Sequence, residues 1–584
     1  NKQRQNQDER WRAFGFYNLK LNFTDWLYLS AKYAFDYYRT RIVESDLSNG
    51  TKYNTMQEIE EDRLTRQEEN HFESNAEFLL IGNNKFGEKF QLNYMAGANF
   101  MYSDQNIYGG DVENMTYKNQ WYWNFANNIN NVTENGWRRV TNSVFGSVQM
   151  AYNEYVSLDI TARNDWSSTL PKDNNSYFYP SFNLGFVASD FVRTHWNKMP
   201  EWITFAKVRL SAAKVGKDAP PYAIYNRWEG GYLKGQAKKP ELSSTKANNN
   251  LRPETSWSYE AGLDMKFLNN RLGFDFTYYY TRTTDQIMTI PEAAPWKLRW
   301  INSGLIVNKG VEAMIYATPV QTKDFTFNLN VNLSHNTSTV KELNEKKKHI
   351  YFEGDQFMPV YVGAVEGGKL GDIYAKRMYK RDENGQIIMK NGVPVFTTDE
   401  QYSLDHPIGN IQPDLLMSVT PFTYKGFTLS ALFDMKFGGD VVSVSEAIAT
   451  SHGISKRTEQ RGELLLPGMN EDGTVNTQRI DAQLFYQAVG GRQQAVAEEF
   501  VYNASFIRLK EISFGYSFPS LLLRKTPVSS LRVSFVGRNL AYLMKHTPGT
   551  SPEGGYDTSM FSQALDFSSL PYSRTFGFSI NVGF

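Results

Sequence analysis

The chain has 584 residues, and its 62 Lys and Arg balance 62 Asp and Glu, so no net charge points to nucleic acid as a partner. Cys is absent, which excludes disulfides and Cys-bound metals, while aromatic residues reach 15% of the chain. No run of roughly 18 apolar residues occurs, so a helical membrane protein is excluded, whereas membrane strands of alternating apolar and polar residues remain allowed.

Alternating apolar and polar residues predict strands from the first aromatic segment onward. Short links at Phe23–Asp25 and Gly82–Lys89 join two pairs of these strands. The polar stretches Glu44–Asn70 and Tyr108–Val140 are predicted to be loops. The strands expected in the first third are Trp11–Leu21, Trp26–Thr40, His71–Ile81, Phe90–Tyr102, Ser143–Tyr152 and Val156–Asn164.

The clearest hairpin lies near the middle of the chain. Apolar and polar residues alternate over Tyr259–Phe267 and again over Leu272–Tyr280, around the minimal turn Leu268–Asn270. One face therefore carries charges and hydroxyls and the other carries apolar side chains, while Gly216–Pro253 is predicted to be a loop. Further strands are expected at Tyr177–Phe191, Ile203–Val215, Val307–Thr318, Phe325–Leu333, Leu415–Tyr424, Phe427–Lys436, Phe506–Ser517 and Leu531–Leu540.

The last twelve residues repeat the same pattern up to the terminal aromatic residue. The strand puts every apolar side chain on one face, as a lipid-facing strand requires. The segment also resembles the signal by which barrels are recognised for membrane insertion. The residues of this predicted assembly signal are Phe576, Phe578, Ile580, Val582 and Phe584.

Short and long connections alternate along the chain, and this alternation decides the predicted fold. We count about 17 strands, each near or above the ~9–11 residues of a tilted membrane strand. The sequence thus predicts an all-β protein, a transmembrane antiparallel β-barrel of the outer membrane with long extracellular loops and short periplasmic turns. Since a bacterial barrel whose termini share a side needs an even number of strands, we expect further strands before residue 1.

Aromatic residues in the predicted loops are the candidate ligand contacts, because flat rings on a polar surface can stack on sugars or pack against peptide side chains. The alternative is that they form an interfacial girdle or pack within loops. The candidates are Trp121, Trp123, Trp228, Tyr232, Trp296 and Trp300.

The two longest loops, Lys341–Asn410 and Val441–Tyr502, exceed what strand reversal requires. Their apolar content predicts order rather than disorder, and Asn384-Gly385 and Asn391-Gly392 predict a small meander of turns in the first of them. We expect such ordered loops to be a docking surface.

The search for catalytic motifs finds no carrier of chemistry. The segment Gly363–Lys369 has the spacing of a phosphate-binding loop, but Leu370 stands where Ser or Thr would bind magnesium. The seven His residues never take metal-ligand spacing. We therefore predict no enzyme activity, no metal and no cofactor.

Three C-terminal segments resemble the closing strands of SusC/RagA-type TonB-dependent outer-membrane transporters of Bacteroidetes. They read VYNASFIRLKEISFGYSFP at Val501–Pro519, LRVSFVGRNLAYL at Leu531–Leu543 and YSRTFGFSINVGF at Tyr572–Phe584. Asn164–Phe186, Leu251–Tyr280 and Leu466–Thr477 are similar to further stretches of that family.

The resemblance implies a plugged barrel of about 22 strands, of which residues 1–584 would be the C-terminal part without the plug and the first strands. It implies import of oligomeric nutrients, glycans rather than peptides. The implied partners are a SusD-like surface lipoprotein as lid, the TonB energy-coupling complex acting through the plug, and outer-membrane lipid. A peptide importer of the same family, a non-transporting adhesin or anchoring barrel, and a membrane enzyme are the alternatives.

Overall fold

A computed structural model describes residues 4–46, 62–117, 120–196, 198–233, 236–344, 348–353, 358–424, 426–549, 551–555, 559, 561–569 and 572–584. Within these ranges, the side chains of 229–233, 236–241, 291, 352–353 and 419–424 are not described. The chain divides into two units: unit 1 comprises Asn1–Gly185, Ser211–Ser258 and Thr283–Ser303, and unit 2 comprises Phe186–Leu210, Tyr259–Arg282 and Gly304–Phe584. Among the described residues, no helix has the length and apolar character needed to cross a membrane.

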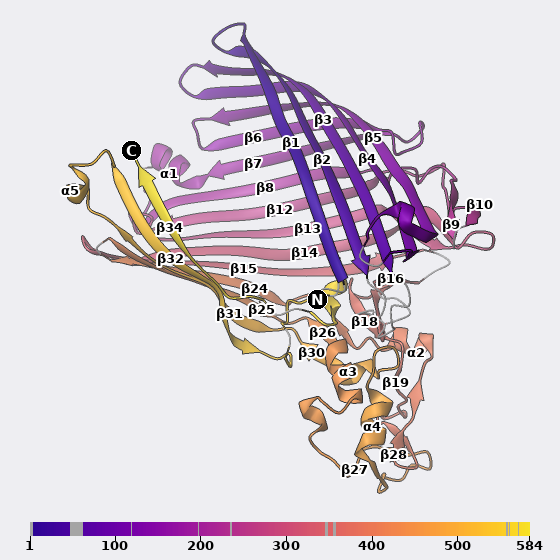
Figure 1. Ribbon diagram of the computed structural model, residues 1–584. Coiled ribbons are helices and arrows are strands. Elements are labelled where there is room, and N and C mark those ends of the chain that lie inside the picture. Colours follow the sequence, from indigo (N-terminus) through magenta and orange to yellow (C-terminus); the bar gives the residue numbers. More distant parts are fainter. Residues whose placement is uncertain are drawn as a thin grey trace. The chain divides into compact units, whose positions relative to one another are not determined.

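Unit 1 is built mainly from consecutive antiparallel strands (Figure 1). The first two pair without any register shift, from Arg4 opposite Asp46 to Asn22 opposite Tyr28. Unit 1 contains β1 (Arg4–Asn22), β2 (Leu27–Asp46), β3 (Arg63–Phe86), β4 (Phe90–Met115), η1 (Trp123–Phe125), β5 (Ala126–Tyr152), β6 (Val156–Ser167), most of β7 (Ser176–Val187), β9 (Trp228–Leu233), β10 (Gln236–Leu242) and β11 (Thr245–Lys246).

The predicted loop at Tyr108–Val140 is wrong for most of its length, because β4 and β5 continue through it. Tyr108 lies opposite Glu134 in this ladder, and the Trp137 indole donates a hydrogen bond of 2.6 Å to Gln105 Oε1. The expected loop at Glu44–Asn70 is likewise shortened by β2 and β3. Backbone pairing needs no apolar alternation where both faces of a strand are polar, so the pattern used for prediction fades while the strand goes on.

Besides β7, four strands contribute residues to both units. The segments between these four strands hold turns and short strands. The division passes through β8 (Ile203–Lys217), β12 (Glu254–Phe267), β13 (Leu272–Pro291) and β14 (Leu298–Gln321). The predicted turn at Leu268–Asn270 is confirmed, with all three residues at positive φ of 52°, 56° and 65°. The predicted loop at Gly216–Pro253 contains the short strands β9, β10 and β11.

The strand predicted at Tyr177–Phe191 ends earlier than expected, at Val187, where helix α1 (Ala188–Trp196) begins. Asp190 in its first turn, and Arg193 and His195 in its last, suit the helix dipole. The remaining strands of the large sheet in unit 2, which we call its wall strands together with those shared with unit 1, are β15 (Phe325–Glu342), β24 (Leu415–Tyr424), β25 (Phe427–Phe437), β31 (Phe506–Ser517), β32 (Ser530–Lys545) and β34 (Thr575–Gly583), with helix α5 (Ser520–Leu523) between β31 and β32.

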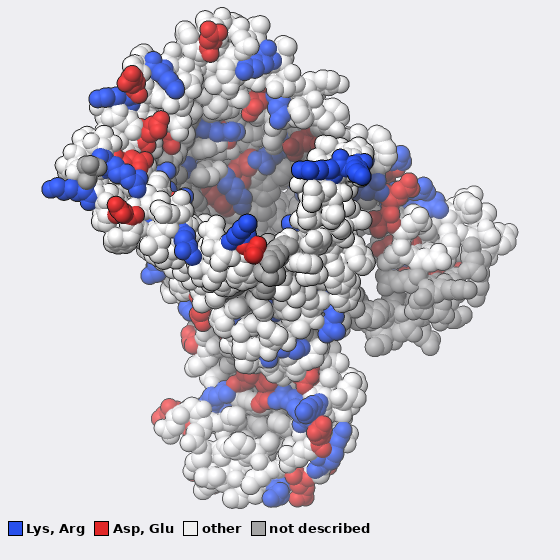
Figure 2. All heavy atoms as spheres, turned by 90° about the vertical axis from the view of Figure 1, so that its left-hand side faces the viewer, with Lys and Arg blue, Asp and Glu red and all other residues white. Residues whose placement is uncertain are grey.

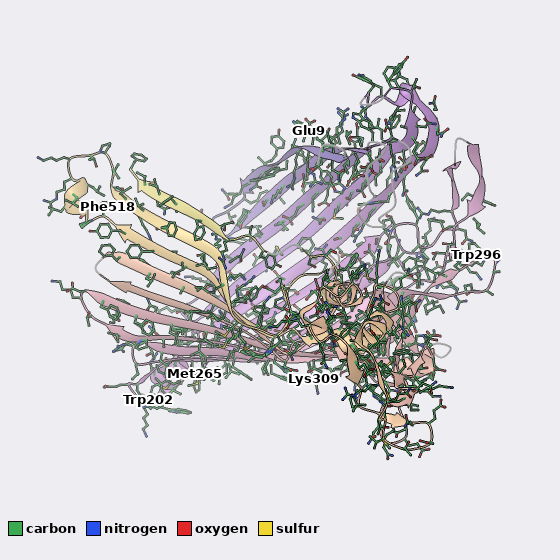
Figure 3. The ribbon with its side chains drawn as sticks, turned by 60° about the horizontal axis from the view of Figure 1, so that its bottom comes forward. Glu9, Trp202, Met265, Trp296, Lys309 and Phe518 are labelled. Carbon is green, nitrogen blue, oxygen red and sulfur yellow. The ribbon has the colours of Figure 1, made fainter. Side chains whose placement is uncertain are left out.

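The wall strands of unit 2 pair antiparallel in chain order, from β14 with β15 to β32 with β34. The connection that holds α5 lies at one end of these strands, the turn end, together with the C-terminal end of β34, and the long connections lie at the other, the loop end (Figure 1). Trp202 and Phe518 lie toward the turn end, while Lys309 lies near the loop end (Figure 3). The predicted alternation of short and long connections is thus confirmed for the wall strands of unit 2, whereas the long loop predicted at Tyr108–Val140 is mostly strand.

Apolar side chains of β34 are exposed, as expected of a surface that faces lipid. Phe578 is 79% exposed, and Phe584, which directly follows the strand, is 86% exposed. The rings of Phe576 and Phe578 contact Phe535 of β32, at centroid distances of 6.1 and 5.5 Å. Across the described residues, the paired large sheet is almost entirely antiparallel, which confirms the predicted fold class.

Candidate functional site

The long connections of unit 2 fold into a compact body, which we call the loop domain (described residues of 348–411, 438–505 and 561–569). Its elements are β16 (His349–Glu353), β17 (Val360–Val365), β18 (Asp372–Ala375), β19 (Met378–Tyr379), β20 (Ile388–Lys390), β21 (Val393–Pro394), β22 (Phe396–Thr397), α2 (Glu400–Asp405), β23 (Gly409–Asn410), β26 (Asp440–Ser443), α3 (Val444–Ser451), η2 (Lys456–Thr458), β27 (Glu463–Leu465), β28 (Met469–Asn470), β29 (Arg479–Asp481), α4 (Ala482–Val489), η3 (Ala497–Phe500), β30 (Val501–Asn503), η4 (Phe561–Ala564) and β33 (Leu565–Asp566).

Three connections that are distant in sequence share the hydrophobic core of the loop domain. Val360, Val362 and Ile373 from the first connection pack with Phe500 from the second and Leu565 from the third, and all five are fully buried. A core of this kind requires a fixed arrangement of its parts. The prediction that the two longest loops are folded rather than disordered is therefore confirmed for their described residues. The predicted meander is present where β20 and β21 meet at Asn391 and Gly392, both at positive φ.

Two neighbouring glutamates join the first two connections. Glu498 accepts hydrogen bonds from the Tyr379 backbone N–H at 2.6 Å and from Arg381 Nη2 at 2.5 Å. Glu499 accepts from the Tyr379 hydroxyl at 2.8 Å and from Arg457 Nη2 at 2.7 Å. Because these carboxylates are mostly shielded from solvent, the three contacts to Tyr379 and Arg381 act as charge-assisted links between the two segments, while Arg457 holds Glu499 from within the second one.

A second link runs through Asn410, which lies between the buried carboxylate of Asp372 and the half-buried carboxylate of Asp440. Its side-chain amide donates to Asp372 Oδ1 at 2.7 Å, and its backbone N–H donates to Asp440 Oδ2 at 3.1 Å. Burial raises the pKa of both Asp372 and Asp440, although these hydrogen bonds oppose the rise. Burial therefore disfavours the ionised carboxylates of Asp372 and Asp440 where β18, β23 and β26 meet, and the hydrogen bonds from Asn410 partly offset this penalty.

A cluster of tyrosines lies at β16, β17 and β18. The Tyr351 ring stacks on Tyr361 at 4.4 Å between centroids, and Lys376 Nζ lies 4.1 Å from the Tyr361 centroid. The Tyr351 hydroxyl donates to Glu400 Oε1 at 3.0 Å, and burial is the main cause that raises the pKa of Tyr351. Stacked rings with a cation beside them form a rigid surface that suits a flat or partly polar ligand.

The polar face of the unit 2 strands holds a cavity of about 370 Å³. Three carboxylates, Asp275, Glu312 and Asp434, line it together with amide and hydroxyl groups. Arg209 binds Asp275 through two nitrogens at 2.8 and 2.6 Å. The other lining residues are Thr277, Ala313, Met314, Asn332, Leu333, Ser334, Leu416, Met417 and Ser418. Such a wall offers many weak hydrogen-bonding positions and no group that would hold one ligand alone.

The predicted ligand aromatics all fall in unit 1, and the described contacts do not gather them into one cluster. Trp121 packs against the buried cluster of Leu64, Val112 and Met115. Trp123 begins η1 and is 43% exposed.

The other four candidates lie on later connections of unit 1. Trp228 opens β9 and is 71% exposed, while the Tyr232 side chain lies outside the described residues. Trp296 follows β13 and is half-buried (Figure 3). Trp300 packs against a cluster that includes Leu170 and Leu251, and its carbonyl accepts from Asn248. A ligand role for these residues stays a prediction.

Two charged networks were not anticipated from the sequence. In unit 1, the buried Asp218 accepts hydrogen bonds from Arg139, Ser167 and Thr169 at 2.9, 2.5 and 3.0 Å. In unit 2, Arg508 is 5% exposed and pairs with Asp434 at 2.9 Å and Glu553 at 2.6 Å. No local pattern marks these charges, because Asp218 directly follows β8 and Arg508 shares β31 with Lys510 and Glu511.

Charged side chains of both signs are interspersed over the face seen in Figure 2, without a large surface of one sign. No group of three or more His, Asp or Glu in the described part of the chain is arranged to hold a metal ion.

The chain resembles known proteins over most of its length. It is 27% identical over 474 residues to TonB-dependent receptor P3 of Formosa agariphila, which covers 76% of this chain and 45% of that protein. It is 25% identical over 451 residues to TonB-dependent receptor SusC of Bacteroides thetaiotaomicron, covering 73% and 43%. This chain thus spans about half the length of the curated relatives it matches.

A solved structure supports the fold. The structure of the RagAB peptide transporter matches with a TM-score of 0.77 and 18% identity, over 100% of this chain and 62% of that one. The family model described as "TonB dependent receptor-like, beta-barrel" matches residues 1–369. With its antiparallel wall, exposed apolar strand faces and ordered long connections, this chain belongs to the TonB-dependent receptor-like β-barrel family of outer-membrane proteins.

Proposed function

We propose that this chain forms the barrel wall of a SusC-like importer that carries oligomeric nutrients, glycans rather than peptides, across the outer membrane. The observation that carries the proposal is the wall itself, whose apolar side chains are exposed while its polar face holds the cavity of about 370 Å³ lined by hydroxyls, amides and carboxylates. A channel with many weak polar contacts lets a hydroxyl-rich oligomer bind and leave again.

Glycan is our preferred substrate class because hydroxyl groups and flat rings are the main features of the candidate surfaces. The Tyr351 and Tyr361 stack and the exposed Trp228 ring match the apolar face of a sugar. The similarity to SusC supports import of this kind. The similarity to the RagAB peptide transporter, at 18% identity, supports the fold without selecting a substrate.

A SusD-like lipoprotein on the loop domain is the partner we propose. The loop domain exposes large apolar side chains, among them Leu465 at 50% and Leu484 at 64%, in β27 and α4. Exposed apolar groups on an otherwise well-packed body favour an interface. Energy would reach the wall through a plug and the TonB complex, which belong to the proposal and not to residues 1–584.

The partner can be tested without disturbing the core. In the full-length receptor, Leu465→Asp with Leu484→Asp should abolish co-purification of the lipoprotein and lower oligosaccharide uptake, whereas Leu465→Met with Leu484→Met should retain both. Heat-modifiable migration in gels checks that each barrel is intact. Normal co-purification and uptake in the Asp variant would contradict the docking role.

Uptake assays also separate the alternatives. Cells that express the full-length receptor should accumulate labelled oligosaccharide in a TonB-dependent manner. Accumulation of labelled oligopeptide alone would favour a peptide importer. Binding of a partner without any TonB-dependent accumulation would favour an adhesin or anchoring barrel.

A further inference from the structure

We propose that a small pocket at the loop end of β31 and β32 binds a carboxylate or sulfate carried by a sugar residue, so that the imported oligosaccharide is anionic. This inference rests on the function proposed above and narrows its substrate class. The pocket has a volume of about 190 Å³. Since pockets for drug-sized ligands hold roughly 300–1,000 Å³, this one suits a single residue of an oligomer.

Arg508 forms the fixed base of this pocket. Its side chain is only 6% exposed and is held by Asp434 Oδ2 at 2.9 Å and Glu553 Oε2 at 2.6 Å. The Arg508 guanidinium carbon lies 6.0 Å from the Tyr542 ring centroid and 5.7 Å from that of Tyr572. Two carboxylates thus balance the charge of Arg508, and their contacts hold the guanidinium group still between two rings.

β32 and the connection after it form the rest of the pocket's lining. The Tyr542 hydroxyl donates to Glu553 Oε2 at 2.8 Å, so it accepts the hydrogen bond of 2.7 Å from the Ser551 hydroxyl. The Tyr572 hydroxyl reaches the Glu553 carbonyl at 3.5 Å. Because both tyrosine hydroxyls are engaged, their rings are fixed and can offer faces to an apolar side of a sugar.

Two further cations give the pocket its selectivity. Lys545 and Arg574 both line it, and Lys545 Nζ lies 6.0 Å from the Tyr542 centroid. Arg574 is exposed and forms no ion pair with any described carboxylate. The charge of Arg508 is matched by Asp434 and Glu553, so Arg574 adds positive charge next to the rings, where the Lys545 ammonium group lies as well. Rings with adjacent cations are the chemistry that recognises an acidic sugar.

Binding to the purified full-length receptor tests the assignment. Calorimetry with trigalacturonate should show binding, and galactotriose, its neutral counterpart, should bind at least tenfold more weakly. Arg574→Gln and Lys545→Gln should each raise the Kd for trigalacturonate about tenfold and leave that for galactotriose unchanged, since each removes one charge-assisted hydrogen bond. Arg574→Lys should retain most of the affinity. A parallel titration with sulfated galactotriose shows whether the pocket prefers sulfate or carboxylate.

The outcomes divide cleanly. No binding of either acidic sugar, equal affinity for the neutral one, or equal loss for both sugars in the Gln variants overturns the pocket assignment. Tighter binding of triglutamate than of trigalacturonate also overturns it, in favour of an acidic peptide. Binding as expected with no TonB-dependent uptake in cells leaves the pocket standing and contradicts the import function instead. Heat-modifiable migration confirms that each variant is folded.

Discussion

The wall and the loop domain of unit 2 use the same apolar residue types in opposite ways. In the wall strand β34, Phe578 is 79% exposed, whereas in the loop domain Phe500 is completely buried. The wall gains stability from backbone ladders and from the lipid that its exposed side chains meet, because those side chains have few protein contacts. The loop domain depends on its own packed core, as a water-soluble domain does.

The largest expected effect tests the packed core. Phe500→Ala should cost about 3–5 kcal/mol, because a fully buried ring beneath the Arg457 guanidinium, 4.8 Å away, would leave a cavity. We expect rapid proteolysis within the loop domain while the barrel keeps its heat-modifiable migration. The matched change Phe578→Ala should leave both unchanged. Equal protease resistance of the Phe500 variant and the original protein would contradict the claim that the loop domain depends on its packed core.

A smaller effect tests the lipid-facing wall. Phe578→Arg should cost about 2–4 kcal/mol if the side chain lies near the middle of the bilayer. The amount of protein inserted in the outer membrane should fall, as measured by immunoblot of membrane fractions. Ser579→Arg, on the other face of β34, is the control and should insert well. If both variants insert alike, the orientation given to β34 is wrong.

The smallest effect is a pH dependence of the link through Asn410. Burial raises the pKa of Asp440 in the folded loop domain, and the nearby Asp414 adds to the rise, so the folded form binds the proton more tightly than the unfolded form. Stability from this group is therefore present at low pH and is lost as pH rises through the folded pKa.

Substitution of the same residue makes this dependence measurable. Asp440→Asn keeps an acceptor for the Asn410 N–H and imitates the protonated acid. Protease resistance of the loop domain should decrease as the pH rises from below 3.8, the ordinary pKa of Asp, through the raised pKa of folded Asp440, and it should decrease less in the variant. An identical pH profile for the two proteins would show that Asp440 takes no part.

The wall strands could be predicted from the sequence because apolar and polar residues alternate within each strand, so the signal needs no distant partner. Alternation along Phe506–Ser517 and Leu415–Tyr424 predicts both strands with the bounds that the structure gives. Prediction failed where the alternation ceases but pairing continues, as in β4 and β5 beyond Tyr108. It also failed at α1, where the strand pattern extends past the point at which the helix begins.

The candidate sites were less accessible to such reasoning because they depend on distant partners. Nothing near Arg508 in sequence shows that Glu553, 45 positions later, would lie beside it.

 The side chain of Glu553 comes from the connection after β32, and only the folded chain brings it to β31. The aromatic candidates show the same limit, since Trp121 and Trp300 pack against buried clusters that no local pattern reveals.

The core that three connections share also sets an order of assembly. Short turns close at little entropic cost, so the hairpins of the wall can pair early, each from its turn end. The loop domain cannot follow that route, because Val360, Phe500 and Leu565 meet only after the strands between them have been placed. Its completion therefore reports that β24, β25, β31 and β32 are already paired, and a surface formed only at that stage would be offered to a partner by finished barrels alone.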